Sequence, residues 1–325
     1  MKKFIFKTLL FVATLVLLDR CFILFREAEH NIFADIAIQK MKKVSSKLRA
    51  KGGDDILFVG SSHGQFAISP QIVSDSLHKS SFNLAYGGGS NMGLQMTLLK
   101  KLVTETSYKP KTIVFAIDVF TLNATPFFDD PVQNVFFQNG DDILKKGRRY
   151  LYSCFKLYGK NLPEYISGAV KGNFKLPYFK KSFYDLSMFD KYEKYEISED
   201  GWVKGFGILN KKYLRYADMT FNPDPKSALL LNEYVQLCRD NGIELFFIQV
   251  PEHAVSLEFQ KKYIDFGMWM KKLTQKSTTA FIDFDTEQKF PVNNDSLFFD
   301  SDHLNKTGAE KFSKLLAADL KKIVK

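Results

Sequence analysis

The chain has 325 residues, of which 45% are hydrophobic and 25% charged, the composition of an ordinary globular protein. That length suits one large domain, or one domain with a substantial insertion, together with an anchor. Lysine and arginine total 46 against 36 aspartate and glutamate, a formal net charge of +10. This balance favours either an acidic partner or a basic surface without a specific partner. No recognition motif for nucleic acid is visible, so we expect no nucleic-acid partner.

The three cysteines do not suggest a metal site. Cys21 lies in an apolar leader, and neither Cys154 nor Cys238 belongs to a CxxC or histidine-rich pattern. We therefore expect no metal and no other cofactor. Cys154 and Cys238 could pair in an oxidising compartment or could be two buried thiols, and the sequence leaves both options open.

Residues 1–26 are predicted to form a membrane anchor. Lysines at the amino terminus precede an apolar run from Thr8 to Leu18, which Asp19-Arg20 interrupts. From Phe4 to Phe25 the length is enough for a spanning helix of roughly 20 residues. No small-x-small cleavage site follows, so we interpret the leader as uncleaved. The alternative is a buried helix, or an amphipathic helix at a surface.

Residues 27–53 are predicted to form a basic juxtamembrane helix, which would lie along the membrane or act as a stalk. Lys51-Gly52-Gly53-Asp54 is the expected boundary before the main domain, residues 54–325. The lysines at positions 2, 3 and 7 favour a cytoplasmic amino terminus. We therefore expect a membrane-anchored protein whose main domain faces the periplasm or cell exterior.

Strand and helix patterns alternate from residue 54, which predicts an α/β domain. We expect a flavodoxin-like three-layer α/β/α fold with a parallel sheet of about five strands. The predicted strands are 56–59, 81–84, 112–117, 243–250 and 280–284. A short helix is predicted after Pro70. Four further helices are predicted at roughly 92–103, 227–239, 259–273 and 306–323.

Between residues 123 and 222 this rhythm breaks. The region is rich in Phe, Tyr, Lys and Gly and includes the basic cluster Lys145-Lys146-Gly147-Arg148-Arg149. We interpret it as an insertion that caps the carboxyl edge of the sheet. Basic residues interleaved with aromatic residues can bind a sugar chain or other polyanion, although a small helical subdomain with its own core has the same composition.

A candidate nucleophile follows the first predicted strand. Ile56–Val59 runs into Gly60-Ser61-Ser62-His63-Gly64, a tight turn that would present the Ser62 hydroxyl at the carboxyl edge of the sheet. Serine needs a nearby base to react, and His303, near the other end of the chain, is the best candidate. Asp300 is spaced to orient His303. Asp302 is the alternative partner, or a cap for the last helix.

Two other motifs are present in part, but the surrounding sequence does not fit the folds that they indicate. Gly60–Gly64 fits the G-x-S-x-G elbow of α/β-hydrolases, but too few strands precede Ser62 and the glycine-rich loop follows it. Gly87-Gly88-Gly89 misses the G-x-G-x-x-G spacing of a dinucleotide site and lacks a suitably placed acidic residue.

The order of three blocks resembles that of the SGNH (GDSL-like) hydrolases. Gly60-Ser61-Ser62 resembles the first block, Asn83 to Gly88 the second, and Asp300-Ser301-Asp302-His303 the last. The resemblance implies a Ser62-His303-Asp300 triad. It also implies that the backbone N–H groups of Ser62 and Gly88, with Gly87 as the alternative, would form the oxyanion hole.

The third block departs from that family. The family places an asparagine after its third strand, whereas this chain has Asp118 there and its nearest asparagine is Asn123, a weak substitute. Membrane-anchored relatives, such as the D-alanyl transfer protein and alginate acetylation proteins, often lack that asparagine too. They accompany membrane-bound O-acyltransferases, so the resemblance implies such an enzyme as a possible partner.

Other polar residues stand near predicted strand ends. Asp118 and His253 are expected at the carboxyl edge, where ligands bind in such sheets, and His63 adjoins Ser62 in sequence. These three residues are candidates for lining the pocket. A loop histidine without a role is the plainer reading of His253, and adjacent side chains usually point apart.

The expected function is that of a serine esterase or O-acyltransferase acting on acyl esters, most simply O-acetyl groups, of a cell-envelope glycan. One alternative is a non-catalytic accessory subunit of a membrane-bound O-acyltransferase. A second is a basic envelope protein that binds polyanions through the insertion.

Overall fold

The computed structural model describes Lys7, Lys40, Lys43 and residues 54–87, 91–105, 109–126, 196–205, 220–254, 260–275, 279–285 and 289–324. Within this set no helix is both long and apolar enough to cross a bilayer. Apart from Lys7, the predicted anchor lies outside the described residues. So do Cys154 and the basic cluster at 145–149.

Five parallel strands form the central sheet, in the order β2-β1-β3-β6-β7. Counted along the chain this is 2-1-3-4-5, the order of flavodoxin-like doubly wound sheets. The α/β class and the five-stranded parallel sheet are confirmed. The strands are β1 (Ile56–Gly60), β2 (Ser81–Asn83), β3 (Thr112–Ala116), β6 (Glu244–Gln249) and β7 (Ala280–Asp283).

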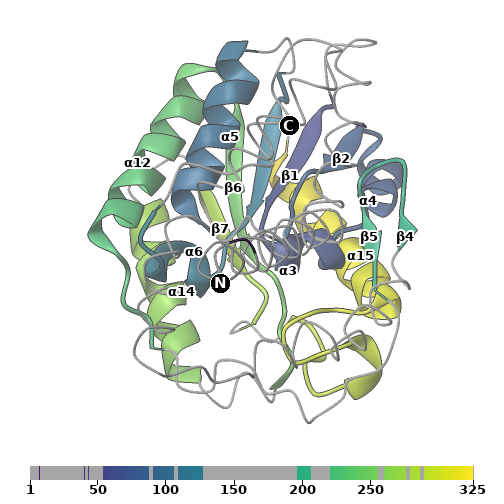
Figure 1. Ribbon diagram of the computed structural model, residues 1–325. Helices are drawn as coiled ribbons and strands as arrows, with labels where there is room; N and C mark the ends of the chain where they lie inside the picture. Colours follow the sequence, from purple (N-terminus) through teal and green to yellow (C-terminus); the bar gives the residue numbers. More distant parts are fainter. Residues whose placement is uncertain are drawn as a thin grey trace.

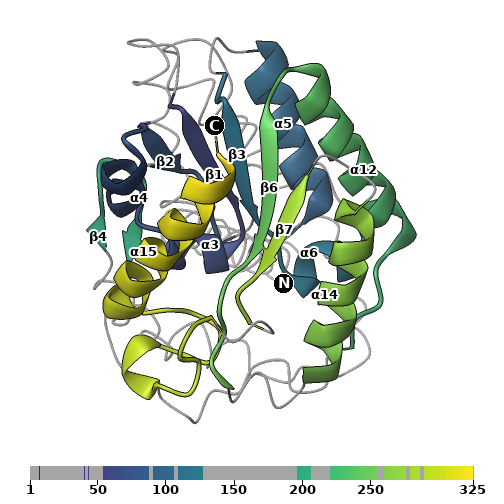
Figure 2. The same cartoon turned by 180° about the vertical axis from the view of Figure 1, so that it is seen from behind.

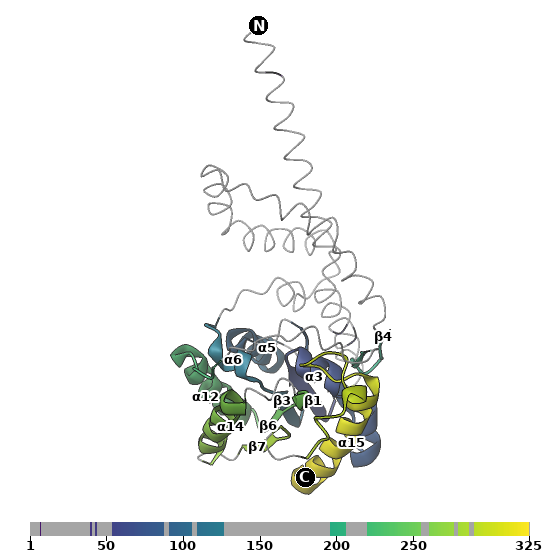
Figure 3. The same cartoon turned by 90° about the horizontal axis from the view of Figure 1, so that it is seen from below.

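Helices cover both faces of this sheet (Figures 1 and 2). One face carries α5 (Met92–Glu105), α12 (Pro225–Asp240) and α14 (Gln260–Thr274), and the other carries α3 (Ser62–Ala67), α4 (Pro70–Leu77) and α15 (Lys306–Ile323). Figure 3 shows α12 and α14 on one side of the strands and α15 on the other. The remaining described elements are α6 (Val119–Asn123), β4 (Glu196–Ile197), β5 (Val203–Lys204) and the short 3₁₀ helix η1 (Asp295–Leu297).

The strands read as continuous apolar runs because both of their faces are buried. In β1, Leu57 and Val59 belong to the core under α5 and α12. Ile56 and Phe58, which alternate with them, belong to the core under α4 and α15. This alternation follows the period of two in a strand and explains why no amphipathic pattern marks these segments in the sequence.

The predicted helix boundaries agree with the observed ones to within about two residues, and local features mark the start of α12. Asp224 accepts hydrogen bonds from the backbone N–H groups of Lys226 and Ser227, and Pro225 is the first residue of α12. Both features favour a helix start at that point. Cys238 lies on the buried side of α12 as a free thiol, and burial raises its pKa to about 12.

Part of the predicted insertion forms an antiparallel hairpin of β4 and β5. Its turn covers the outer edge of β2, because Asn83 N donates to the Asp200 carbonyl at 2.9 Å. Gly201 has φ +85°, and a Cβ atom there would lie 2.4 Å from the Asn83 carbonyl oxygen. Sheet edges with free N–H groups invite unwanted pairing, and this hairpin blocks that edge.

Candidate active site

The turn after β1 places Ser62 at the carboxyl edge of the sheet. Gly60 ends the strand with φ +134°, and a Cβ atom there would lie 2.3 Å from the Ala116 carbonyl oxygen, so only glycine fits. Ser61 then caps α3, its hydroxyl accepting from His63 N at 3.3 Å. Ser62 is therefore the first residue of a short helix. The sequence predicted a turn at this position and not a helix.

Ser62, His303 and Asp300 form a continuous hydrogen-bonded chain. His303 Nε2 lies 2.8 Å from Ser62 Oγ, and His303 Nδ1 lies 2.9 and 3.0 Å from the two carboxylate oxygens of Asp300. A neutral imidazole with its proton on Nδ1 donates to Asp300 and accepts from Ser62. This is the arrangement of a nucleophile, its base and the group that orients the base.

Packing and backbone contacts hold Asp300 and His303 in place. Asp300 Oδ1 accepts from the backbone N–H groups of Asp302 and His303, both at 2.8 Å. Phe299 stacks on the His303 ring with 5.5 Å between centroids, and Phe66 meets it edge-on at 5.3 Å. The imidazole has one well-defined orientation, which general-base catalysis requires.

The loop that carries His303 is tied to the start of α15. Asn305 caps that helix by accepting from Gly308 N at 3.0 Å, and its amide donates to the Ser296 carbonyl at 2.7 Å. The alternative in which Asp302 caps the last helix is therefore wrong. Asp302 instead accepts from the Ser301 hydroxyl at 2.7 Å, and Asp300 holds the His303 ring. Since α15 packs on α3 and α4, the loop lies over Ser62.

The expected oxyanion donors are backbone N–H groups in two segments that run side by side. Tyr86 N donates to the Gly60 carbonyl at 3.1 Å, so the segment after β2 runs alongside the turn that holds Ser62. Within the described residues, neither Ser62 N nor Gly87 N has an acceptor. Gly88, the first choice from the sequence, lies outside the described residues.

Asn123, the weak substitute for the family asparagine, is engaged elsewhere. Its amide nitrogen donates to the Thr220 carbonyl at 2.7 Å, and its amide oxygen accepts from Asn222 N at 2.9 Å. Asn123 thereby ties the end of α6 to the segment that precedes α12. The structure gives this amide a structural role.

A second polar cluster adjoins the triad. His63 Nδ1 lies 3.4 Å from Asp118 and 3.9 Å from Glu252, and the His63 ring meets the His303 ring at 5.2 Å. Burial lowers the pKa of His63, while Asp118 acts in the opposite direction. Although Ser62 and His63 are adjacent, helical geometry sets them about 100° apart, and both face His303.

Asp118 has a defined structural role. Its Oδ2 accepts from the Ser61 hydroxyl at 2.5 Å, and its Oδ1 accepts from Thr121 N and Oγ1, both at 2.8 Å. It therefore caps α6 and clamps the start of α3 to the end of β3. The sequence marked Asp118 as a pocket residue but gave no sign of this bond to Ser61.

His253 contacts the loop that carries His303. Its Nε2 atom lies 2.9 Å from Asp295 Oδ1, its ring packs edge-on against Phe298, and its backbone N donates to the Ser301 carbonyl. It braces the loop that carries His303. No three His, Cys, Asp or Glu side chains of the described part of the chain form a group suited to a metal ion.

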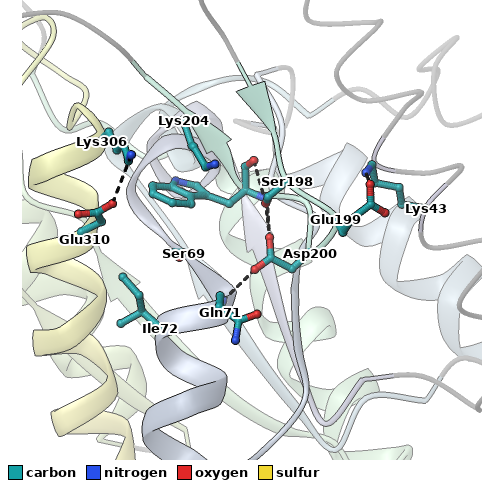
Figure 4. Close-up of a pocket in the computed structure, with 11 residues that line it drawn as sticks. Lys43, Ser69, Gln71, Ile72, Ser198, Glu199, Asp200, Lys204, Lys306 and Glu310 are labelled. Carbon is teal, nitrogen blue, oxygen red and sulfur yellow. Dashed lines mark hydrogen bonds and ion pairs between the residues drawn. The ribbon is translucent and has the colours of Figure 1, made fainter.

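An open pocket of about 640 Å³ lies between the hairpin, α4 and the start of α15 (Figure 4). Both lysine and acidic side chains line it, and they include Lys204, Lys306, Glu310 and Glu199. None of the triad residues lines it. Trp202, which lines the pocket, donates its indole N–H to the carbonyl of Phe66 at 2.9 Å, and the Phe66 ring meets the His303 ring.

Comparisons with known proteins add little to this geometry. One family model, which carries no description of a function, matches residues 207–325. That span includes Asp300 and His303 but not Ser62, and it is less than half of the chain. No curated protein sequence matches the chain.

Proposed function

We propose that this protein is a serine esterase or O-acyltransferase of the SGNH type. The observation that carries the proposal is the chain of hydrogen bonds from Ser62 Oγ through His303 to Asp300, at 2.8 and 2.9 Å. The doubly wound sheet, with the serine after its first strand, supports the same class.

The mechanism follows from these contacts. His303 Nε2 takes the hydroxyl proton as Ser62 Oγ attacks the acyl carbon of an ester. Asp300 stabilises the imidazolium that forms. In this proposal the oxyanion accepts from the backbone N–H groups of Ser62 and of Gly88 or, as the alternative, Gly87. Each such donor lowers the barrier by roughly 3 kcal/mol. The C–O bond then breaks, and His303 returns the proton to the leaving alcohol.

The second half-reaction uses the same groups. His303 takes a proton from water or from an acceptor hydroxyl, whose oxygen attacks the acyl-enzyme, and Ser62 is restored. Water gives hydrolysis and a sugar hydroxyl gives acyl transfer. In keeping with the resemblance to anchored SGNH proteins, we propose an acylated glycan of the cell envelope as substrate and an extracytoplasmic, membrane-anchored location.

An accessory role beside a membrane-bound O-acyltransferase is the second candidate. The observation that favours it is Asp118, which stands where the SGNH family has an oxyanion asparagine and whose carboxylate accepts bonds from Ser61 and Thr121. With one side-chain donor fewer, the site would stabilise an oxyanion less well. The ordered triad favours the enzyme over this alternative.

Fluorophosphonate labelling tests the proposal without a known substrate. The full chain in detergent is treated with the probe beside Ser62→Ala and a matched control, Ser76→Ala. Ser76 is an exposed serine on α4 whose hydroxyl bonds only within its helix. We expect the parent and the control to be labelled and Ser62→Ala to remain unlabelled. A folded parent that stays unlabelled would contradict the enzyme and favour the accessory role.

A further inference from the structure

Lys40 is a buried lysine upstream of the main domain. Its side chain is fully buried, and its Nζ atom lies 2.5 Å from the Ala85 carbonyl oxygen and 3.5 Å from Asn83 Oδ1. Burial holds the pKa of Lys40 well below its usual value, and the charge of Asp200 partly opposes this. A lysine is rarely buried without a specific partner, because desolvating an ammonium group is costly.

The carbonyl that Lys40 holds belongs to the segment that leads to Gly87. Leu84 N donates to the Phe58 carbonyl at 2.8 Å, and Tyr86 N donates to the Gly60 carbonyl at 3.1 Å. The Ala85 carbonyl and the Tyr86 N–H belong to one planar peptide unit. Lys40 binds one end of that unit and Gly60 the other, so together they fix the plane from which the chain continues to Gly87.

Asn83 extends the same network to the helix that begins with Ser62. Its amide nitrogen donates to the carbonyl oxygens of Gly64 at 2.9 Å and Ile68 at 2.8 Å. Its amide oxygen accepts from Ala85 N at 3.0 Å as well as from Lys40. The Lys40 side chain therefore contacts both the segment before Gly87, the alternative oxyanion donor, and the asparagine that holds α3.

Lys43 contacts a different part of the domain. Its Nζ lies 2.5 Å from Glu199 Oε1 in the hairpin turn (Figure 4), and the Glu199 side chain is 96% exposed. An ion pair whose carboxylate lies in solvent in this way contributes little to stability. Lys43 lies three positions after Lys40, and both are helical, which makes Lys43 a matched control for Lys40.

We infer that Lys40 is a positioning residue of the candidate active site: its contact with the Ala85 carbonyl orients the peptide that leads to the Gly87 N–H. A residue before the predicted domain boundary at Asp54 thereby belongs to the working site. This inference rests on the proposed function for its effect on rate, but the contact itself can be tested separately.

The experiment compares the full chain in detergent with Lys40→Met and Lys43→Met, using two readouts. The first is amide hydrogen exchange of the peptide that covers Leu84–Gly87. The second is the pH dependence of the fluorophosphonate labelling rate. We expect Lys40→Met to speed the exchange at least tenfold and to lower the plateau labelling rate about tenfold or more. A misplacement of about 1 Å can reduce rates on this scale.

The pH midpoint of labelling separates positioning from general damage. Because Ser62, His303 and Asp300 are untouched, the acid limb should keep its midpoint in Lys40→Met, whereas a distorted triad would shift it. Lys43→Met should match the parent in both readouts. If Lys40→Met melts below the assay temperature, Lys40→Ala is assayed with added n-propylamine, which should restore slow exchange and the labelling rate.

Equal exchange in Lys40→Met and Lys43→Met would overturn the inference, as would a lack of rescue by n-propylamine in the alanine variant. A parent that exchanges as expected but is never labelled would instead contradict the proposed function and leave the positioning contact established. The two failures are therefore distinguishable.

Discussion

His303 Nε2 and Ser62 Oγ lie 2.8 Å apart although the two residues are 241 positions apart in the chain. The contact exists because α15 packs against α3 on one face of the sheet. It brings a base from one end of the domain to a hydroxyl from the other end.

Replacing Asp300 by asparagine should slow labelling of Ser62 by about 10³- to 10⁴-fold. An amide at this place favours the wrong imidazole tautomer, and the corresponding change in serine proteases has an effect of that order. The rate of fluorophosphonate labelling measures the effect. Asp302→Asn is the control, since Asp302 bonds to Ser301 rather than to the His303 ring. Equal losses in both variants would show that Asp300 has no special role.

Ser61→Ala should lower the free energy of unfolding by about 1–3 kcal/mol, because it removes the cap of α3 and the bond to buried Asp118. Urea denaturation measures this change. Ser76→Ala, on the exposed face of α4, should change stability by less than about 0.5 kcal/mol. If the two alanine variants are equally stable, the clamp between Ser61 and Asp118 does not contribute to stability.

Gly201→Ala should destabilise the protein more than Gly242→Ala. Both glycines have positive φ, at +85° and +67°, where alanine is strained by roughly 1 kcal/mol. At Gly201 the new Cβ would also lie 2.4 Å from the Asn83 carbonyl oxygen, whereas nothing lies within 4 Å at Gly242. The midpoint of thermal unfolding of each variant is the measurement. Gly242→Ala reports backbone strain alone, and Gly201→Ala reports strain together with a steric clash. A smaller effect at Gly201 would mean that the hairpin does not pack on β2.

The contribution of Asp285 to stability should fall as the pH rises from about 4 to about 8. Burial raises the pKa of this carboxyl from 3.8 to about 8, so the folded state keeps a proton that the unfolded chain has already released. The contribution of this group has a slope that approaches about 1.4 kcal/mol per pH unit. Urea denaturation between pH 5 and 8 measures it.

Asp285→Asn provides the comparison for that slope. Asparagine cannot ionise, and all other titrating groups are common to both proteins, so the difference between the two stability curves isolates Asp285. The variant should gain stability relative to the parent with increasing pH up to about 8. Parallel curves over the whole range would contradict the raised pKa.

Much of the sheet could be predicted from the sequence because its signals are local. Runs such as Ile56–Val59 are apolar enough to be buried on both faces, and caps such as Asp224-Pro225 mark helix starts. Ser62, His303 and Asp300 could be selected because they stand in short motifs. Their hydrogen bonds, however, depend on packing between α3 and α15, which no local pattern encodes.

The supporting residues could not be predicted for the same reason. Ser61 meets Asp118 only because β1 and β3 are neighbours in the sheet. Lys40 reads as one more charge in a basic stretch, and only the fold shows that its ammonium group is buried against Ala85. The helix over Ser62–Ala67 was missed because glycine and serine in Gly60–Gly64 favour a turn, whereas packing against β1 and α15 stabilises the helix.

The position of α15 at the end of the domain has a consequence for biosynthesis. Ser62 and the helix it begins are made before His303 and α15, the helix that covers α3 and α4. Until then, the apolar residues of α4 that pack under α15, such as Val73, have no cover. A nascent chain that still lacks α15 therefore has neither the base beside Ser62 nor a cover for this apolar surface.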